Sequence, residues 1–272
     1  MRFLIAAVAI AAIGGSASAQ GETGFLRGRG NLDAVVSVNY DSFDEFFLGP
    51  SPVAPPITGV ERTIYSLYAA YGVTDNIDLV TTLAWVDAQA DAENFLLSDE
   101  SGLQNATVGI KARLGKWRLG PGNFSVVASP AVKFPVRDFD SFEDNPINAL
   151  GHNQVDLRAR LIAQYQLDSG SWFAIEGGYD RRNGTPADEI PLNVTLGVNV
   201  LDRLTISPFY SLNDSRGETD TGLETTGIGF DRYGVGFFLP ITDGLGLSGN
   251  VRRTDEGRNV SDGFSFGLVL RF

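Results

Sequence analysis

Hydrophobic and polar residues alternate strictly along most of the chain after residue 30. The clearest segment is 154–167, where every odd-numbered side chain is apolar and the even-numbered ones, Ile162 apart, are Gln, Asp or Arg. A period of two places successive side chains on opposite faces of a β-strand. The pattern therefore predicts strands with one apolar and one polar face, and no segment after the first twenty residues indicates a helix.

This alternation predicts twelve strands of about ten residues or more. They are expected at 31–47, 60–73, 77–88, 103–114, 123–136, 151–167, 171–182, 189–200, 203–214, 228–239, 245–254 and 263–272. Short turns at 74–76, 168–170, 201–202 and 241–244 and a longer one at 115–122 alternate with polar loops at 48–59, 89–102, 137–150, 183–188, 215–227 and 255–262. An even number of antiparallel strands with short turns at one end and long loops at the other is typical of outer-membrane barrels.

An apolar face on every strand needs an apolar partner. A second sheet supplies one in a soluble sandwich, which is the alternative fold, but strands there are usually about five or six residues long. In lipid every backbone group must be paired within the protein, so a sheet has to close on itself. We therefore expect an all-β fold, a closed antiparallel transmembrane β-barrel over residues 31–272.

The first nineteen residues have the features of a secretory signal peptide. Arg2 precedes an apolar run over 3–13, and Ala17-Ser18-Ala19 is a small-residue cleavage site. The run is too short to span a bilayer of about 30 Å as a helix. We expect cleavage before Gln20, export to the outer membrane of a Gram-negative bacterium, and a short periplasmic segment at 20–30.

Aromatic residues with outward parity gather at the two ends of the predicted strands. Those assigned to the short-turn rim include Tyr71, Tyr165 and Phe272, and those assigned to the long-loop rim include Trp85, Tyr179 and Tyr210. Amphipathic rings favour the two membrane–water interfaces. The alternating C-terminal strand ending in Phe272 resembles the signal that the barrel assembly machinery recognises, so this machinery is one expected partner. Outer-membrane lipids and lipopolysaccharide are the other expected partners.

Composition excludes several function classes. The net charge of −12, with 21 basic residues against 33 acidic ones, argues against nucleic-acid binding. The absence of Cys excludes thiolate metal sites, and a single His excludes a multi-histidine site. No nucleotide-binding loop is present, so we predict no cofactor, no metal and no energy coupling.

The charge divides unequally between the lumen and the loops. The strand pattern points ten basic and five acidic side chains into the lumen. The basic ones are Arg62, Lys111, Arg113, Lys133, Arg158, Arg160, Arg203, Arg232, Arg252 and Arg271, and the acidic ones are Asp41, Asp78, Asp156, Glu176 and Asp180. The last five long loops and their margins hold sixteen acidic residues and three arginines. An acidic mouth is therefore expected over a net basic lumen.

The inward charges allow two interpretations. Lys111, Arg113, Lys133, Arg158 and Arg160 would form a basic wall that contacts anionic or hydrogen-bonding solutes. The alternative is structural: register places Arg158 beside Asp180 and Arg160 near Glu176, so that these pairs, with Asp156 and Arg232 elsewhere in the lumen, fill the interior. For the acidic loops, the alternatives are simple solvation or divalent cations that bridge to lipopolysaccharide.

A lipid hydrolase and a structural or adhesive barrel are the two alternatives to a channel. An outer-membrane lipid hydrolase would need a nucleophile beside His152, the only histidine, and no serine is placed against it by the sequence. A structural or adhesive barrel would have a filled lumen and loops that bind a partner. We therefore expect the protein to be a passive channel or transporter for small solutes rather than an enzyme.

Two segments resemble a known family. Residues 71–79, YGVTDNIDL, resemble the strand–turn–strand signature YG(L/V)TDx(L/I)xL of the outer-membrane transporter family grouped with the phenol-degradation meta-pathway proteins. Residues 101–103, SGL, and 108–114, VGIKARL, resemble that family's SGLGD and GxKxRL segments, with Gln104-Asn105 in place of Gly-Asp. The resemblance implies an outer-membrane transporter for aromatic or other small hydrophobic compounds, and it assigns no binding residue.

Overall fold

A computed structural model describes residues 23–45, 59–89, 100–137, 154–183, 188–200, 203–216, 230–255 and 260–272, and their regular structure is entirely β. The strands are β1 (Leu32–Glu45), β2 (Val60–Thr74), β3 (Ile77–Gln89), β4 (Glu100–Leu103), β5 (Ala106–Leu119), β6 (Gly122–Phe134), β7 (Asp156–Leu167), β8 (Trp172–Arg181), β9 (Asp188–Val200), β10 (Leu204–Arg216), β11 (Phe230–Thr242), β12 (Leu245–Asp255) and β13 (Val260–Arg271). Among these residues no helix has the length and apolar character needed to cross a membrane. The signal-peptide prediction lies outside the described residues.

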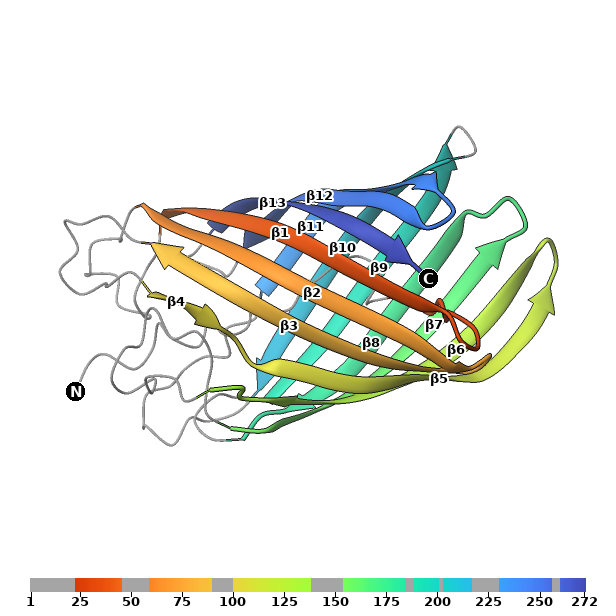
Figure 1. The fold of residues 1–272 in the computed structure, drawn as a ribbon, viewed down its shortest axis with the longest axis horizontal. Coiled ribbons are helices and arrows are strands. Elements are labelled where there is room, and N and C mark those ends of the chain that lie inside the picture. The colour runs from red at the N-terminus through yellow and green to blue at the C-terminus, as the bar shows by residue number, and fades with distance from the viewer. Residues whose placement is uncertain are drawn as a thin grey trace.

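The sheet closes into a barrel through its first and last long strands (Figure 1). β1 pairs antiparallel with β13 from Asp33↔Arg271 to Glu45↔Val260, and along its other edge with β2. Each remaining long strand pairs with its neighbours in the ring, so twelve strands make up the wall. The predicted all-β, twelve-strand closed barrel is confirmed.

A thirteenth strand, β4, pairs with the same neighbouring strand as β5, so the two segments together occupy one strand position in the barrel wall. Both pair with β3: β4 opposite Trp85–Ala88, and β5 opposite Ile77–Thr82. Gln104 and Asn105 interrupt the ladder between them, and both are buried. The backbone N–H of Gln104 donates to the carbonyl oxygen of Ala84 at 2.8 Å. The single strand expected at 103–114 is therefore two strands separated by a kink.

Three further gaps in the ladder each contain a proline. Pro130 lies in the gap between β5 and β6, Pro191 between β8 and β9, and Pro208 between β9 and β10. Proline has no N–H to donate, and a closed barrel has no outer edge on which to place it. The wall accommodates each proline by a local loss of pairing.

The turn expected at 115–122 is shorter in the structure. β5 continues to Leu119 after a bulge between Arg113 and Gly115, and the turn is 120–121, with Gly120 at a φ of 54°. Both Nη atoms of Arg118 donate to the carboxylate of Asp168, in the turn of the next hairpin, at 2.6 Å. This hydrogen bonding holds the pKa of Asp168 below its usual value. The extended hairpin is thus tied to its neighbour at the short-turn end of the barrel.

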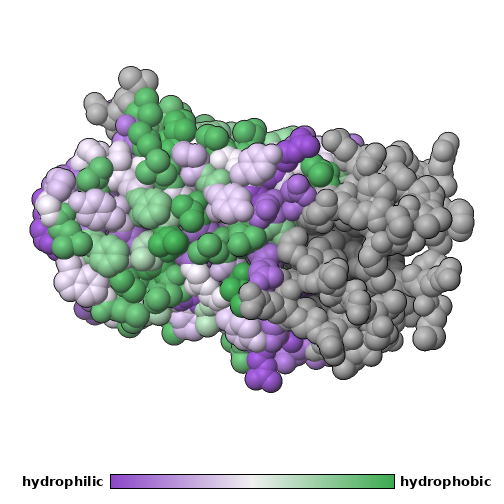
Figure 2. Space-filling model, turned by 180° about the vertical axis from the view of Figure 1, so that it is seen from behind, coloured by the Kyte–Doolittle hydropathy of each residue, from purple (hydrophilic) through white to green (hydrophobic). Residues whose placement is uncertain are grey.

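The two faces of the sheet differ as the alternation predicts. Outward side chains such as Leu79, Leu161 and Phe266 are exposed, whereas inward neighbours such as Asp78 and Gln164 are buried. Figure 2 shows hydrophobic residues spread over much of the described surface, with a hydrophilic band beside the end that carries the long loops. An apolar exterior around a polar interior is the arrangement that a lipid environment stabilises.

A charge placed on the middle of the outer face tests the membrane assignment. We expect Leu161→Arg, at a side chain that is 53% exposed near the centre of β7, to lower the free energy of unfolding by about 2–4 kcal/mol. Val155→Arg, at the long-loop rim, should cost about 1 kcal/mol or less. Denaturant unfolding in lipid vesicles measures both, and equal costs at the two positions would contradict a membrane-embedded belt.

Candidate functional site

The short-turn end of the lumen contains the N-terminal segment, residues 23–31. The backbone N–H of Gly24 donates to Oε1 of Gln164 on β7 at 2.8 Å. The backbone N–H of Arg27 donates to Oδ2 of Asp78 on β3 at 2.9 Å. The described part of the predicted periplasmic segment at 20–30 lies against inward side chains of the barrel wall.

Lys111 is the main anchor of this segment. It lies on β5, is 1% exposed, and its Nζ donates to the carbonyl oxygens of Thr23 and, at 3.1 Å, Phe25. The Phe25 ring packs edge-on against Trp172 of β8, with centroids 5.6 Å apart. A buried ammonium needs several acceptors, and the backbone of the N-terminal segment supplies them.

A second set of contacts holds the segment where it enters β1. Gly30 N–H donates to the Gly72 carbonyl at 2.8 Å, and Gly72 N–H donates to the Asn31 carbonyl at 2.9 Å. A Cβ at position 72 would lie 1.8 Å from the Gly28 carbonyl oxygen, so this close approach requires glycine. The Gly72 of the YGVTD motif therefore has a structural role in seating the N-terminal segment.

A cavity of about 850 Å³ remains beside the segment at the same end of the barrel. One side is formed by the segment itself, including Phe25 and Arg27, and the opposite side by residues of β10 to β13, including Ser207, Phe238 and Arg271. The volume falls within the range of small-molecule sites, roughly 300–1,000 Å³. The N-terminal segment therefore narrows the short-turn end and leaves an open space along one wall.

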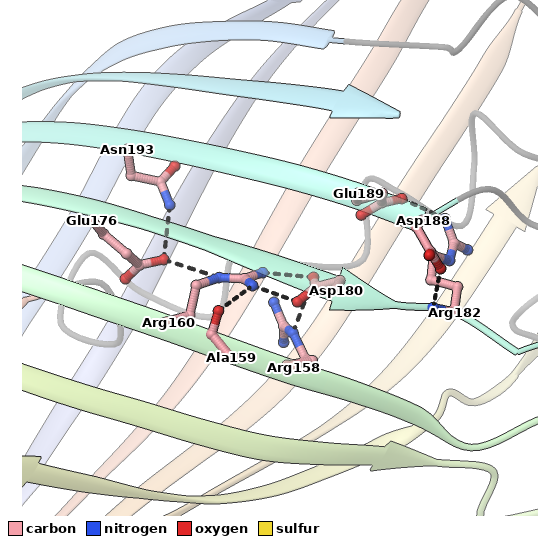
Figure 3. A network of polar contacts seen from close by, with 9 residues as sticks. All are labelled: Arg158, Ala159, Arg160, Glu176, Asp180, Arg182, Asp188, Glu189 and Asn193. Atoms are coloured by element: carbon pink, nitrogen blue, oxygen red, sulfur yellow. Dashed lines mark hydrogen bonds and ion pairs between the residues drawn. The ribbon is translucent and has the colours of Figure 1, made fainter. Parts of the chain in front are cut away.

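The wall formed by β7, β8 and β9 carries a network of paired charges (Figure 3). Arg160 donates to both oxygens of Asp180, and its Nε lies 3.4 Å from Oε1 of Glu176. Arg158 Nε donates to Asp180 at 3.3 Å, and Asn193 donates to Glu176 at 3.0 Å. Both ion pairs that register placed here are present in the structure.

A second cluster lies on the opposite wall. Asp41 of β1 accepts hydrogen bonds from Nε and Nη2 of Arg252 at 3.1 and 2.7 Å, and Arg62 Nη2 lies 3.6 Å from its other oxygen. Arg232 Nε donates to Thr254 Oγ1 at 3.0 Å, and its guanidinium lies over the Phe230 ring. These side chains are buried, so they also form part of the packed lumen.

The predicted basic wall does not form one continuous surface. Lys111 binds the N-terminal segment, and Arg113 donates to the Asp75 carbonyl and Asn76 Oδ1 beside the β2–β3 turn at 3.3 and 3.2 Å. Lys133 stands opposite Asp156 in the β6–β7 register. Arg158 and Arg160 belong to the carboxylate network, so each of the five cations lies beside a carboxylate or an uncharged oxygen acceptor of the protein.

The other predicted positions are distributed along the rims. Tyr71, Trp85, Tyr179, Tyr210 and Phe272 are all exposed outward or at a strand end, and Tyr165 donates to the Leu119 carbonyl at 2.8 Å. His152 and most of the acidic loop residues lie outside the described residues. The bridging of divalent cations by the loops therefore stays a prediction.

Sequence reasoning missed the contribution of the N-terminal segment and of Asp33. Asp33 accepts from Arg27 and lies 3.6 Å from Arg271 Nε. The available signal was the apolar pair Phe25-Leu26 in an otherwise Gly-rich, polar stretch. Strand periodicity carries no information about a segment that forms no strand.

Release of the N-terminal segment should follow loss of its anchor. Lys111→Met removes two hydrogen bonds from a charged donor, each worth about 1.5–3 kcal/mol, so the detached population should rise at least tenfold. The chain has no cysteine, so a spin label at Leu26→Cys reports the mobility of the segment uniquely. Lys116→Met, on the exposed end of β5, should leave the label immobile, and the anchor assignment fails if Lys111→Met does the same.

The carboxylate network should be important for stability. Arg160→Met leaves two buried carboxylates without their shared partner and should cost about 3–5 kcal/mol. Arg158→Met removes a cation whose side chain is 31% exposed, so about 1 kcal/mol or less is expected. Denaturant unfolding measures the difference, and a smaller cost for Arg160→Met than for Arg158→Met would show that Arg160 is not the central cation.

Comparison with solved structures shows the same fold in a known channel. The COG4313 outer membrane channel from Pseudomonas putida F1 matches with a TM-score of 0.73 at 14% identity, over 90% of this chain and 96% of that chain. The translocator domain of the autotransporter NalP from Neisseria meningitidis gives 0.48 at 12% identity, over 90% and 89%. Outer membrane phospholipase A from Escherichia coli gives 0.45 at 12% identity, over 87% and 89%.

Comparison with protein-family models identifies the family to which the sequence belongs. No match is found among curated proteins. The model described as "Putative MetA-pathway of phenol degradation" matches residues 57–272, which include the whole barrel after β1. The family inferred from the YGVTD and SGL segments is therefore confirmed. This outer-membrane β-barrel belongs to the family described as "Putative MetA-pathway of phenol degradation".

Proposed function

We propose that the protein is a passive outer-membrane channel for small solutes, without catalytic activity. The observation that carries the proposal is the cavity of about 850 Å³ at the short-turn end of the barrel, lined in part by the N-terminal segment. A barrel whose only role is structural has no need of such a space. The similarity in fold to a protein named as an outer membrane channel supports the proposal.

The N-terminal segment determines how wide the conduit is. Its carbonyls bind Lys111, and Arg27 engages Asp78 and Asp33, so the segment is held by side chains on three separate strands. Solutes would pass between this segment and the β10–β13 side of the lumen. A conduit of this kind needs no energy source, because solutes move down their own gradient.

Removal of the segment provides the test. We expect the wild-type protein in planar bilayers to give small single-channel conductance, and deletion of residues 23–28 to raise it several-fold, because the constriction is lost. Lys111→Met should give an intermediate or flickering conductance, and Lys116→Met should conduct as the wild type does. If neither the wild type nor the deletion variant conducts, the lumen is filled and the structural or adhesive function is favoured.

A further inference from the structure

The cavity has an aromatic lining on both of its sides. Phe25 and Trp172 contribute rings from the N-terminal segment and β8, and Phe238 contributes a ring from β11. Phe25 and Trp172 are already in edge-to-face contact, at an interplanar angle of 89°. Several rings that line one cavity favour a flat aromatic ligand, because offset and edge-on ring contacts add to the burial of apolar area.

Arg271 is the more exposed of the two arginines that line this space. Its guanidinium lies over the Phe238 ring, 5.0 Å from the centroid, and its Nε is 3.6 Å from Asp33 Oδ2. The side chain is 39% exposed, whereas Asp33 is 6% exposed and is also bound by Arg27. Arg271 therefore keeps part of its planar set of donors for a ligand, and such a set matches a carboxylate in geometry.

Two arginines beside the cavity share one carboxylate, that of Asp33. Asp33 accepts a hydrogen bond from Arg27 and lies 3.6 Å from Nε of Arg271, and Nε of Arg27 also lies 4.0 Å from Asp78. Asp243, the other carboxylate of the cavity lining, lies on the exposed β11–β12 turn. A ligand carboxylate beside Arg271 would give this arginine a partner that it does not share with Arg27.

We propose that this cavity is a binding site for a monoanionic aromatic carboxylate, with its ring between Trp172 and Phe238 and its carboxylate on Arg271. The site rests on the proposed channel function, since it lies on the same conduit, and it specifies the chemical class of solute. A neutral aromatic compound would gain the ring contacts and lack the ion pair. The site would therefore bind a compound that carries both an aromatic ring and a carboxylate more tightly than one that carries the ring alone.

Tryptophan fluorescence provides a direct measurement of binding. With Trp85→Phe and Trp117→Phe, Trp172 is the only remaining tryptophan of the three. Benzoate is expected to change its emission in a saturable way, and benzyl alcohol to bind at least about tenfold more weakly. Arg271→Gln should weaken benzoate binding about tenfold and leave benzyl alcohol unchanged.

Matched variants separate the site from general effects. Arg253→Gln removes an arginine paired with Asp262 on the outer rim and should not alter binding. Phe238→Leu removes a ring and should weaken both ligands, and it tests the site independently if Arg271→Gln does not fold. Equal affinity of the wild type for the two ligands, or equal weakening of both by Arg271→Gln, would overturn the proposal.

Conductance distinguishes this proposal from the one on which it rests. Saturable benzoate binding by a protein that does not conduct would refute the channel and retain the site. Conductance without discrimination between benzoate and benzyl alcohol would retain the channel and refute the site.

Discussion

The structure depends on the pairing of backbone hydrogen bonds in a medium that offers none. In the hydrocarbon region an unpaired N–H or C=O costs several kcal/mol, so the sheet must have no free edge. β1 meets this requirement by pairing with β13 as well as β2. Even the prolines are accommodated inside the ring, at local gaps in the ladder, because no edge strand exists to receive them.

Closure of the barrel also determines where the charged side chains lie and why they pair. When the apolar faces turn to lipid, the polar faces must share one narrow interior, where unpaired charges are costly. Carboxylates and guanidiniums from neighbouring strands therefore pair, as Arg160 does with Asp180 and Glu176. Lys111 differs from these arginines, since its acceptors come from the backbone of the N-terminal segment rather than from another strand.

The N-terminal segment links the wall to the proposed conduit. It has no strand partner of its own, yet it is held by Gln164, Asp78 and Lys111 and by the close approach at Gly72. Because these residues belong to β7, β3, β5 and β2, one short peptide connects distant parts of the ring. The same peptide leaves a cavity along the opposite wall, next to Arg271 and Phe238.

The sequence by itself determined the barrel, the number of long strands, the outward belt and the inward register of Arg158 with Asp180, because a period of two and alternating loop lengths are local properties of the chain. Only the tertiary structure decided what the other inward charges, such as Lys111 and Arg271, contact. Contacts between segments far apart in the sequence place residues 23–31, give the cations of the predicted basic wall their separate partners, and bring Arg27 and Asp33 to Arg271. A single strand's pattern records which face a side chain occupies, and it cannot record which partner closure brings to that face.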